Sequence, residues 1–195
     1  ILSLFIDVTP GGNVLGFTPD LAKGLCMLLV LPLMAAILAI PVCLVGLAFK
    51  PLRQLSLFLI IPAVLFVGTF FISARIGNVM RIQAFQKLAE RSQPLVEAID
   101  RYDKDHSQPP QTLKDLVPQY LPEIPKTGMA GYPEFEYYAG AKAKNYHDNP
   151  WVLVVPTPLG FLNWDNFMYF PKQNYPEEGY GGVLERVGDW AYVHE

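Results

Sequence analysis

The first half of the chain contains two long apolar stretches, and the second half has the mixed pattern of a folded domain. Between residues 25 and 74 the only charged side chains are Lys50 and Arg53. Residues 25–49 and 55–74 each reach the roughly 20 apolar residues that cross a bilayer. We therefore predict a transmembrane hairpin of two helices in residues 20–74, joined by a tight turn, with residues 1–19 as a surface arm.

A buried helical hairpin of a soluble protein is the alternative interpretation. The remainder of a 195-residue chain is too small to cover two continuous apolar helices on every side. Composition also favours the membrane, because 51% of the residues are hydrophobic and only 17% are charged, against about a quarter in soluble domains.

The charges beside the apolar stretches predict the side of the membrane on which each part lies. Basic residues favour the cytoplasmic side, and Lys50 and Arg53 lie in the turn between the two helices. The turn is expected in the cytoplasm and both termini outside it, although Arg75 and Arg81 act in the opposite direction. We predict a protein of the bacterial inner (cytoplasmic) membrane whose domain at residues 75–195 is periplasmic or otherwise extracytoplasmic.

The second apolar helix continues without a breaker into residues 75–91, which predicts one long helix leaving the membrane. Four residues at helical spacing define its apolar face: Leu88, Leu95, Ile99 and Tyr102. Pro94 is expected to kink or restart this helix, and residues 106–110 to end it. Residues 111–120 are expected to form a second, short helix.

Beyond residue 125 the pattern becomes strand-like. Five segments rich in β-branched and aromatic residues are strand candidates: 135–138, 151–155, 167–170, 183–187 and 190–193. The last two flank Gly188 and Asp189, a two-residue turn that predicts a β-hairpin. A long helix packed on four or five short antiparallel strands gives the C-terminal domain an α+β fold.

The helix face and the segment after it together resemble a known family. The residues that carry the resemblance are Leu95-x3-Ile99-x2-Tyr102, then Pro109-Pro110-x2-Leu113-x2-Leu116-Val117-Pro118-x-Tyr120-Leu121-Pro122-x-Ile124-Pro125, then Phe135-x-Tyr137. Over roughly residues 55–138 the chain resembles type II secretion pseudopilins and type IV pilin-like proteins. The resemblance implies a membrane helix that continues into an amphipathic helix, with an antiparallel sheet packed on it, and it implies little about function.

Three features depart from the pilin pattern. Pilins are cleaved after a glycine at the start of the membrane helix and keep a glutamate five residues into it. Here the helix follows Pro51-Leu52-Arg53-Gln54, its fifth residue counted from Leu55 is Leu59, and another apolar helix precedes it. The prepilin cleavage motif is missing, so the resemblance implies a pilin-like domain used as a fixed extracytoplasmic module.

No sequence motif for catalysis or for a cofactor is present, and we predict neither. A formal net charge of −3 without a basic run argues against binding to nucleic acid. Cys26 and Cys43 both lie in the first apolar stretch, so the C-terminal domain has no thiol. The weak candidates for a metal site are three side chains with oxygen donors suited to calcium, for which turn formation is the alternative role: Asn163, Asp165 and Asn166.

The C-terminal domain has more aromatic side chains than so small a sheet is expected to bury. Aromatic residues are enriched at protein interfaces and at membrane surfaces. We predict that six of them contact a partner: Trp151, Phe161, Trp164, Tyr175, Tyr180 and Trp190. The alternative is a small core that compensates with large side chains.

Together these patterns predict a non-catalytic structural or accessory subunit of a larger membrane protein complex. Its partners are expected to be other integral membrane subunits and the lipid bilayer. Two alternatives stay open: a component of a pilus or type II secretion system, and an extracytoplasmic sensor module that binds a ligand or calcium.

Overall fold

The computed structural model describes residue 24 and residues 28–158 and 163–194. The predicted surface arm at residues 1–19 and the first positions of the first apolar stretch lie outside the described residues. The chain divides into two compact units, and in the described part the first ends at Met80 and the second begins at Arg81. The second unit thus starts six residues after the boundary predicted at residue 75.

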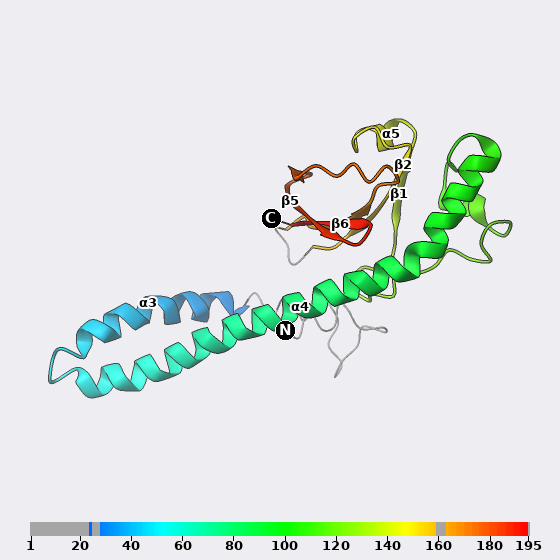
Figure 1. Ribbon diagram of the computed structural model, residues 1–195. Helices are drawn as coiled ribbons and strands as arrows, with labels where there is room; N and C mark the ends of the chain where they lie inside the picture. The colour runs from blue at the N-terminus through cyan, green and yellow to red at the C-terminus, as the bar shows by residue number, and fades with distance from the viewer. Residues whose placement is uncertain (1–23, 25–27, 159–162, 195) are drawn as a thin grey trace. The chain divides into compact units, whose positions relative to one another are not determined.

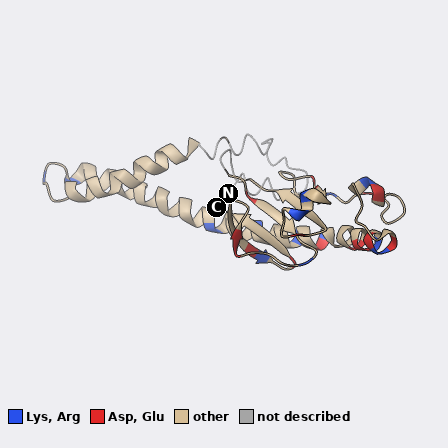
Figure 2. Cartoon of the chain, turned by 90° about the horizontal axis from the view of Figure 1, so that it is seen from above, with Lys and Arg blue, Asp and Glu red and all other residues tan. Residues whose placement is uncertain are grey.

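The first unit contains helix α3 (Val30–Gly46) and the beginning of helix α4 (Arg53–His106). The two helices lie side by side (Figures 1 and 2). They meet closely at Gly46, where an added Cβ atom would lie 2.2 Å from Ser56 Oγ. Helix α3 is shorter than the predicted 25–49, because residues 47–49 already belong to the turn and residues 25–27 are not described.

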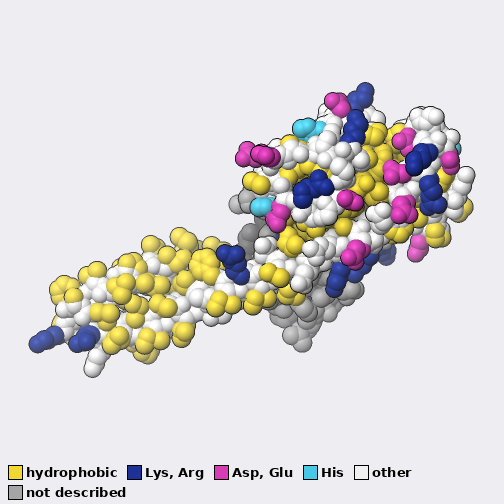
Figure 3. Space-filling view, viewed as in Figure 1, with side chains coloured by type: hydrophobic (Ala, Val, Ile, Leu, Met, Phe, Trp, Pro, Cys, Tyr) yellow, Lys and Arg dark blue, Asp and Glu magenta, His cyan; other side chains and the backbone are white. Residues whose placement is uncertain are grey.

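The surface of this unit is apolar. Leu31 of α3 and Phe58 of α4 are both 75% exposed, and most neighbouring large side chains are exposed as well. Figure 3 shows hydrophobic side chains over this surface, with basic side chains at the turn between the helices. Among the described helices α4 is long and apolar enough to cross a membrane, and only 6% of its most apolar 18-residue window is buried.

Helix α4 is continuous over 54 residues, which confirms the prediction of one long helix. Pro94 does not end it, and the ribbon bends in its C-terminal part (Figure 1). Nearby, the Ser92 hydroxyl donates to the Leu88 carbonyl at 2.7 Å, a bond that often bends helices, and Pro94 lacks a backbone donor. The helix ends at His106 because Ser107 has a φ of 56°, a left-handed conformation that cannot continue a right-handed helix.

The predicted second helix at residues 111–120 is wrong in extent. Only the four-residue 3₁₀ helix η1 (Leu113–Leu116) forms there. The backbone N–H of Thr112 donates to Asp115 Oδ2 at 2.8 Å and fixes its start. Pro118 prevents its extension, because proline lacks a backbone donor and disfavours helical geometry in the residue before it.

The second unit is built on an antiparallel sheet of six strands in the order β1-β2-β3-β6-β5-β4. The strands are β1 (Glu136–Ala139), β2 (Trp151–Pro156), β3 (Asn166–Tyr169), β4 (Glu178–Gly179), β5 (Gly182–Val187) and β6 (Trp190–His194). All five predicted strands are confirmed to within one residue at each end, whereas the two-residue β4 escaped prediction. Strands β5 and β6 form the predicted hairpin at Gly188, whose φ of 63° suits glycine.

Both faces of the sheet are covered. On one face the second half of α4 packs against the strands, with Phe85 stacked on Phe167 at a centroid distance of 4.6 Å. The other face carries a smaller buried cluster to which the short helix α5 (Ala141–Lys144) and Tyr146 contribute. Strand β2 contributes alternate residues to the two clusters, and its first five residues are all buried. Trp151 of β2, Phe167 of β3 and Trp190 of β6 are accordingly all buried.

Candidate functional site

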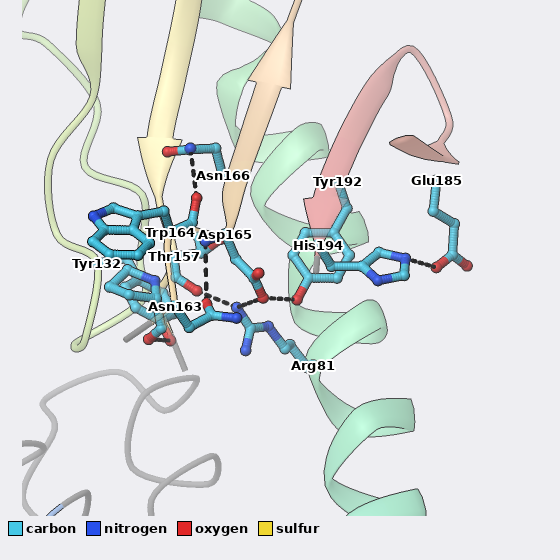
Figure 4. A network of polar contacts seen from close by, with 11 residues as sticks. Arg81, Tyr132, Thr157, Asn163, Trp164, Asp165, Asn166, Glu185, Tyr192 and His194 are labelled. Atoms are coloured by element: carbon cyan, nitrogen blue, oxygen red, sulfur yellow. Dashed lines mark hydrogen bonds and ion pairs between the residues drawn. The ribbon is translucent and has the colours of Figure 1, made fainter. Parts of the chain in front are cut away.

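A buried ion pair lies at the start of the second unit. Arg81 of α4 and Asp165, just before β3, have side chains that are each 1% exposed, and Arg81 Nη2 lies 3.6 Å from Asp165 Oδ2 (Figure 4). The same Nη2 donates a hydrogen bond to the backbone carbonyl of Thr157, just after β2. The guanidinium group thereby connects the helix to both ends of the loop between β2 and β3.

Aromatic rings enclose the Arg81 guanidinium. Its central carbon lies 5.1 Å from the ring centroid of Tyr192, 5.3 Å from that of Phe85 and 5.9 Å from that of Tyr132. Cation–π attraction of this kind is strongest when the cation is removed from water. The Tyr192 hydroxyl donates to Asp165 Oδ2, so β6 joins the same network.

The polar atoms of this network are incompletely paired. Four of them are buried and have no hydrogen-bond partner in the described part of the chain: Arg81 Nε, Arg81 Nη1, Thr157 Oγ1 and Asp165 Oδ1. Each such atom costs about 1–3 kcal/mol of desolvation. The arrangement suits a structural role, because it joins a helix, a loop and a strand through one charge pair.

Burial raises the pKa of the Tyr192 hydroxyl above its ordinary value. The hydrogen bond to Asp165 acts in the same direction, and the nearby Arg81 opposes it. Burial likewise raises the pKa of Tyr175, and it raises the pKa of Tyr180 to about 12. In the unfolded chain these groups ionise near pH 10. Their neutral forms therefore stabilise the fold fully below about pH 10, and this contribution is lost as the pH rises from there towards the folded pKa values.

We expect the second unit to lose stability steeply above about pH 10. Each tyrosine that stays neutral in the folded state while it ionises in the unfolded state lowers the free energy of unfolding by up to about 1.4 kcal/mol per pH unit. Urea unfolding of the full chain in detergent micelles, followed by tryptophan fluorescence from pH 7 to about 11, measures the effect. Trp151, Trp164 and Trp190 all lie in the second unit, so the signal reports on that unit.

The Tyr192→Phe variant is the control for this prediction. It lacks one of the hydroxyls whose pKa is raised. Its free energy of unfolding should therefore fall less steeply with pH than that of the original chain, whatever its value at pH 7. Equal slopes for the two proteins would show that Tyr192 does not contribute.

The three calcium candidates do not present a common set of free oxygens. Asp165 Oδ2 is engaged by Arg81 and Tyr192, and the cationic guanidinium disfavours a second cation beside this carboxylate. Asn163 Oδ1 accepts from the backbone N–H of Asp165 at 3.1 Å, and Asn166 Nδ2 donates to the Trp164 carbonyl at 2.8 Å. These short-range bonds are those of turn-forming side chains. In the described residues no group of three or more His, Cys, Asp and Glu side chains is placed to hold a metal ion.

Two of the six aromatic residues predicted to meet a partner lie in the core instead. Trp151 is 1% exposed and Trp190 is 2% exposed, because α4 covers the face of the sheet to which both point. Trp164 is 69% exposed and is available to a partner. Tyr175 and Tyr180 are half-buried. Phe161 lies outside the described residues.

The prediction from sequence missed the role of Arg81, which it treated only as a charge near the membrane. A signal was present in the helix pattern. Arg81 lies four residues before Phe85, and Phe85 lies three before Leu88, so Arg81 continues the apolar face of α4 towards its N-terminal end. A charged residue in register with a core face predicts a buried partner of opposite charge, but the spacing does not indicate which carboxylate that is.

No protein-family model, no curated protein and no solved structure matches the chain.

Proposed function

We propose that the chain is a non-catalytic structural or accessory subunit of a membrane protein complex. In this proposal α3 and the first part of α4 form a transmembrane hairpin, and the α+β unit that follows is extracytoplasmic. The observation that carries the proposal is the apolar surface of the first unit, on which Leu31, Val42 and Phe58 are each more than 70% exposed. Surface of this kind is stable only against lipid or other apolar helices.

The distribution of charge supports the orientation. Lys50 and Arg53 are at the turn between α3 and α4, and Arg75 is the other charged residue between residue 24 and Met80 (Figure 2). A basic turn favours the cytoplasmic side, which supports a second unit on the opposite side.

Features of the second unit support a structural role over a chemical one. Its most buried charges, Arg81 and Asp165, neutralise each other and connect a helix to a loop. Trp164 offers an exposed aromatic side chain of the type that anchors protein interfaces. The ion pair fits a unit whose helix and loop are fixed to each other, and the exposed Trp164 fits a unit that contacts other subunits.

A component of a pilus or type II secretion system is the second candidate. It is favoured by the sequence resemblance over residues 55–138 and by the continuity of α4 from an apolar half into a half that packs on an antiparallel sheet. A gene located among those for a prepilin peptidase and an assembly ATPase would favour this candidate over the first. The sensor module is less favoured, because Asp165 is engaged by Arg81.

We expect the tagged full chain, purified from its native membrane in mild detergent, to bring down other integral membrane subunits in fixed ratio. The Trp164→Ala variant should recover less of them, because truncating an exposed aromatic anchor commonly costs more than 1 kcal/mol of binding. Val183→Ala, at an exposed apolar position in β5, is the matched control and should leave recovery unchanged. A monodisperse monomer without companions would contradict the proposal.

A further inference from the structure

One face of α4 in the first unit carries a regular row of exposed apolar side chains. The four most exposed large apolar side chains of this helix are Phe58, Leu65, Ile72 and Val79, which are between 58% and 75% exposed. They follow one another at intervals of seven residues, so they lie along one face of the helix. Ser56, which is buried at the contact with α3, lies about 200° around the helix from Phe58. The row therefore faces away from α3.

A second row on the same face repeats at the same interval. Ile61, Gly68 and Arg75 each follow a residue of the first row by three positions. Spacing alternately by three and four residues defines the seam along which two helices pair in a left-handed coiled coil. We call the seven residues of the two rows the outer seam. From Phe58 to Val79 it is about 32 Å long, close to the roughly 30 Å of a bilayer's hydrocarbon core, so a helix paired along all of it crosses the membrane.

Gly68 leaves a gap in the middle of the outer seam. A Cβ atom added to Gly68 would meet nothing within 4 Å, so this glycine lies open on the surface of the helix. Small residues in membrane helices let the backbone of a second helix approach closely. The gap therefore suits a helix as the occupant of the seam.

Two polar groups beside the outer seam lack their usual hydrogen-bond partners. Pro62 has no N–H, so the carbonyl of Phe58 loses its helical donor. The Thr69 side chain is exposed, and its hydroxyl forms no hydrogen bond with the described part of the chain. Pro62 and Thr69 each come four positions after a residue of the first row and so lie beside it. Unpaired polar groups are costly in hydrocarbon and lipid chains cannot bond to them, so a helix with a polar side chain at this depth is favoured over lipid.

Arg75 gives the outer seam a positive charge without a counter-ion. The described part of the first unit has three basic side chains, Lys50, Arg53 and Arg75, and no acidic one. Lys50 and Arg53 lie beside the turn, at the other end of the apolar stretch. The Arg75 side chain is exposed and forms no ion pair with any described residue of either unit. Charged side chains of membrane helices commonly pair with a group of opposite charge, so Arg75 favours an occupant with a carboxylate at this level.

We propose that the outer seam binds a transmembrane helix of a partner subunit, which packs against Gly68 and places an aspartate or glutamate beside Arg75. A second copy of this chain fits less well. Two copies inserted in the same orientation and paired about a two-fold axis would bring their Arg75 side chains together. The inference deepens the proposed accessory role, and it rests on that role for the membrane and for the source of the helix.

Photo-cross-linking in the native membrane identifies the occupant. Leu65→p-benzoylphenylalanine and Ile72→p-benzoylphenylalanine place the probe on the outer seam, and the same change at Leu38 or Val42, exposed positions of α3, is the matched control. We expect both seam positions to cross-link to one transmembrane helix of one subunit. Mass spectrometry of the cross-linked peptides should show a carboxylate in that helix, at the level of Arg75. The α3 positions should give no adduct with it.

Further variants test the contacts within the helix pair. Gly68→Leu fills the gap and should lower the yield of cross-linked product about tenfold, whereas Ala35→Leu, at an exposed position of α3, should leave it unchanged. Arg75→Glu should lower the yield by a similar factor, and changing the identified carboxylate of the partner helix to lysine should restore it. Lys87→Glu, at an exposed position further along α4, is the charge control. Protease digestion of a C-terminal tag shows whether each variant still inserts.

Four results would overturn the inference. The seam positions label only lipid, they give a cross-linked pair of this chain, the helix that they reach has no carboxylate near Arg75, or the exchange of charges does not restore the yield. In each case the tagged chain can still recover other subunits from the membrane. The outer seam can therefore fail while the accessory role stands, and a chain recovered alone would contradict both.

Discussion

Replacing Arg81 with methionine is expected to lower the free energy of unfolding of the second unit by about 3–5 kcal/mol, because it leaves the Asp165 carboxylate buried without its cation. The side chains of both residues are 1% exposed, so water cannot replace the lost partner without opening the structure. Methionine keeps the apolar stem that packs beside Phe85. Urea unfolding at pH 7, monitored by tryptophan fluorescence of the full chain in micelles, gives the difference.

Two further variants make this result specific to the ion pair. Arg101→Met changes an exposed arginine of the same helix and should cost less than about 0.5 kcal/mol. Arg81→Met/Asp165→Asn removes both charges, and its asparagine still accepts from Tyr192. It should be more stable than Arg81→Met alone, since no buried charge remains. If the losses of unfolding free energy from the two single changes simply add in the double variant, the role of the pair is contradicted. The same holds if Arg81→Met lowers the free energy of unfolding no more than Arg101→Met does.

The second large effect is expected from charges placed in the apolar part of α4. Ile61 and Leu65 are 57% and 65% exposed and lie one helical turn apart. An aspartate at the centre of a membrane helix costs about 3 kcal/mol, so changing both residues shifts the insertion equilibrium by about four powers of ten. In a Gram-negative host the second unit should then stay in the cytoplasm.

Protease digestion of spheroplasts measures this change through a tag at the C-terminus. The tag of the original chain should be digested by added protease, and the tag of Ile61→Asp/Leu65→Asp should be protected. Val117→Asp/Val183→Asp introduces the same charges at exposed apolar positions of the second unit and should behave like the original chain. Digestion in every variant would contradict a membrane-spanning α4, and protection of the original tag would contradict the proposed orientation.

Local patterns predicted much of the fold. The five principal strands follow from alternating β-branched and aromatic residues, and the hairpin at Gly188 follows from its two-residue turn. The long helix follows from apolar spacing without a breaker, and its end at His106 is where the prediction placed it. These features depend on residues close together in the chain, and the types of those residues set the local backbone conformation.

The failures of prediction have two physical causes, packing between distant segments and the local effect of a proline. Trp151 and Trp190 were expected at an interface, but the sheet is covered on both faces and encloses them. The helix expected at residues 111–120 shrank to η1, because Pro118 outweighed the favourable residues before it.

By itself the sequence determined the long helix and the five principal strands, and it determined that the first two helices are apolar over most of their length. Only the tertiary structure decided that Arg81 pairs with Asp165, 84 positions further along the chain, and that β1 lies at the edge of the sheet. Strand order and buried charge pairs depend on contacts between segments far apart in the chain. Residue spacing along a single helix or strand carries no information about which distant segment comes to lie beside it.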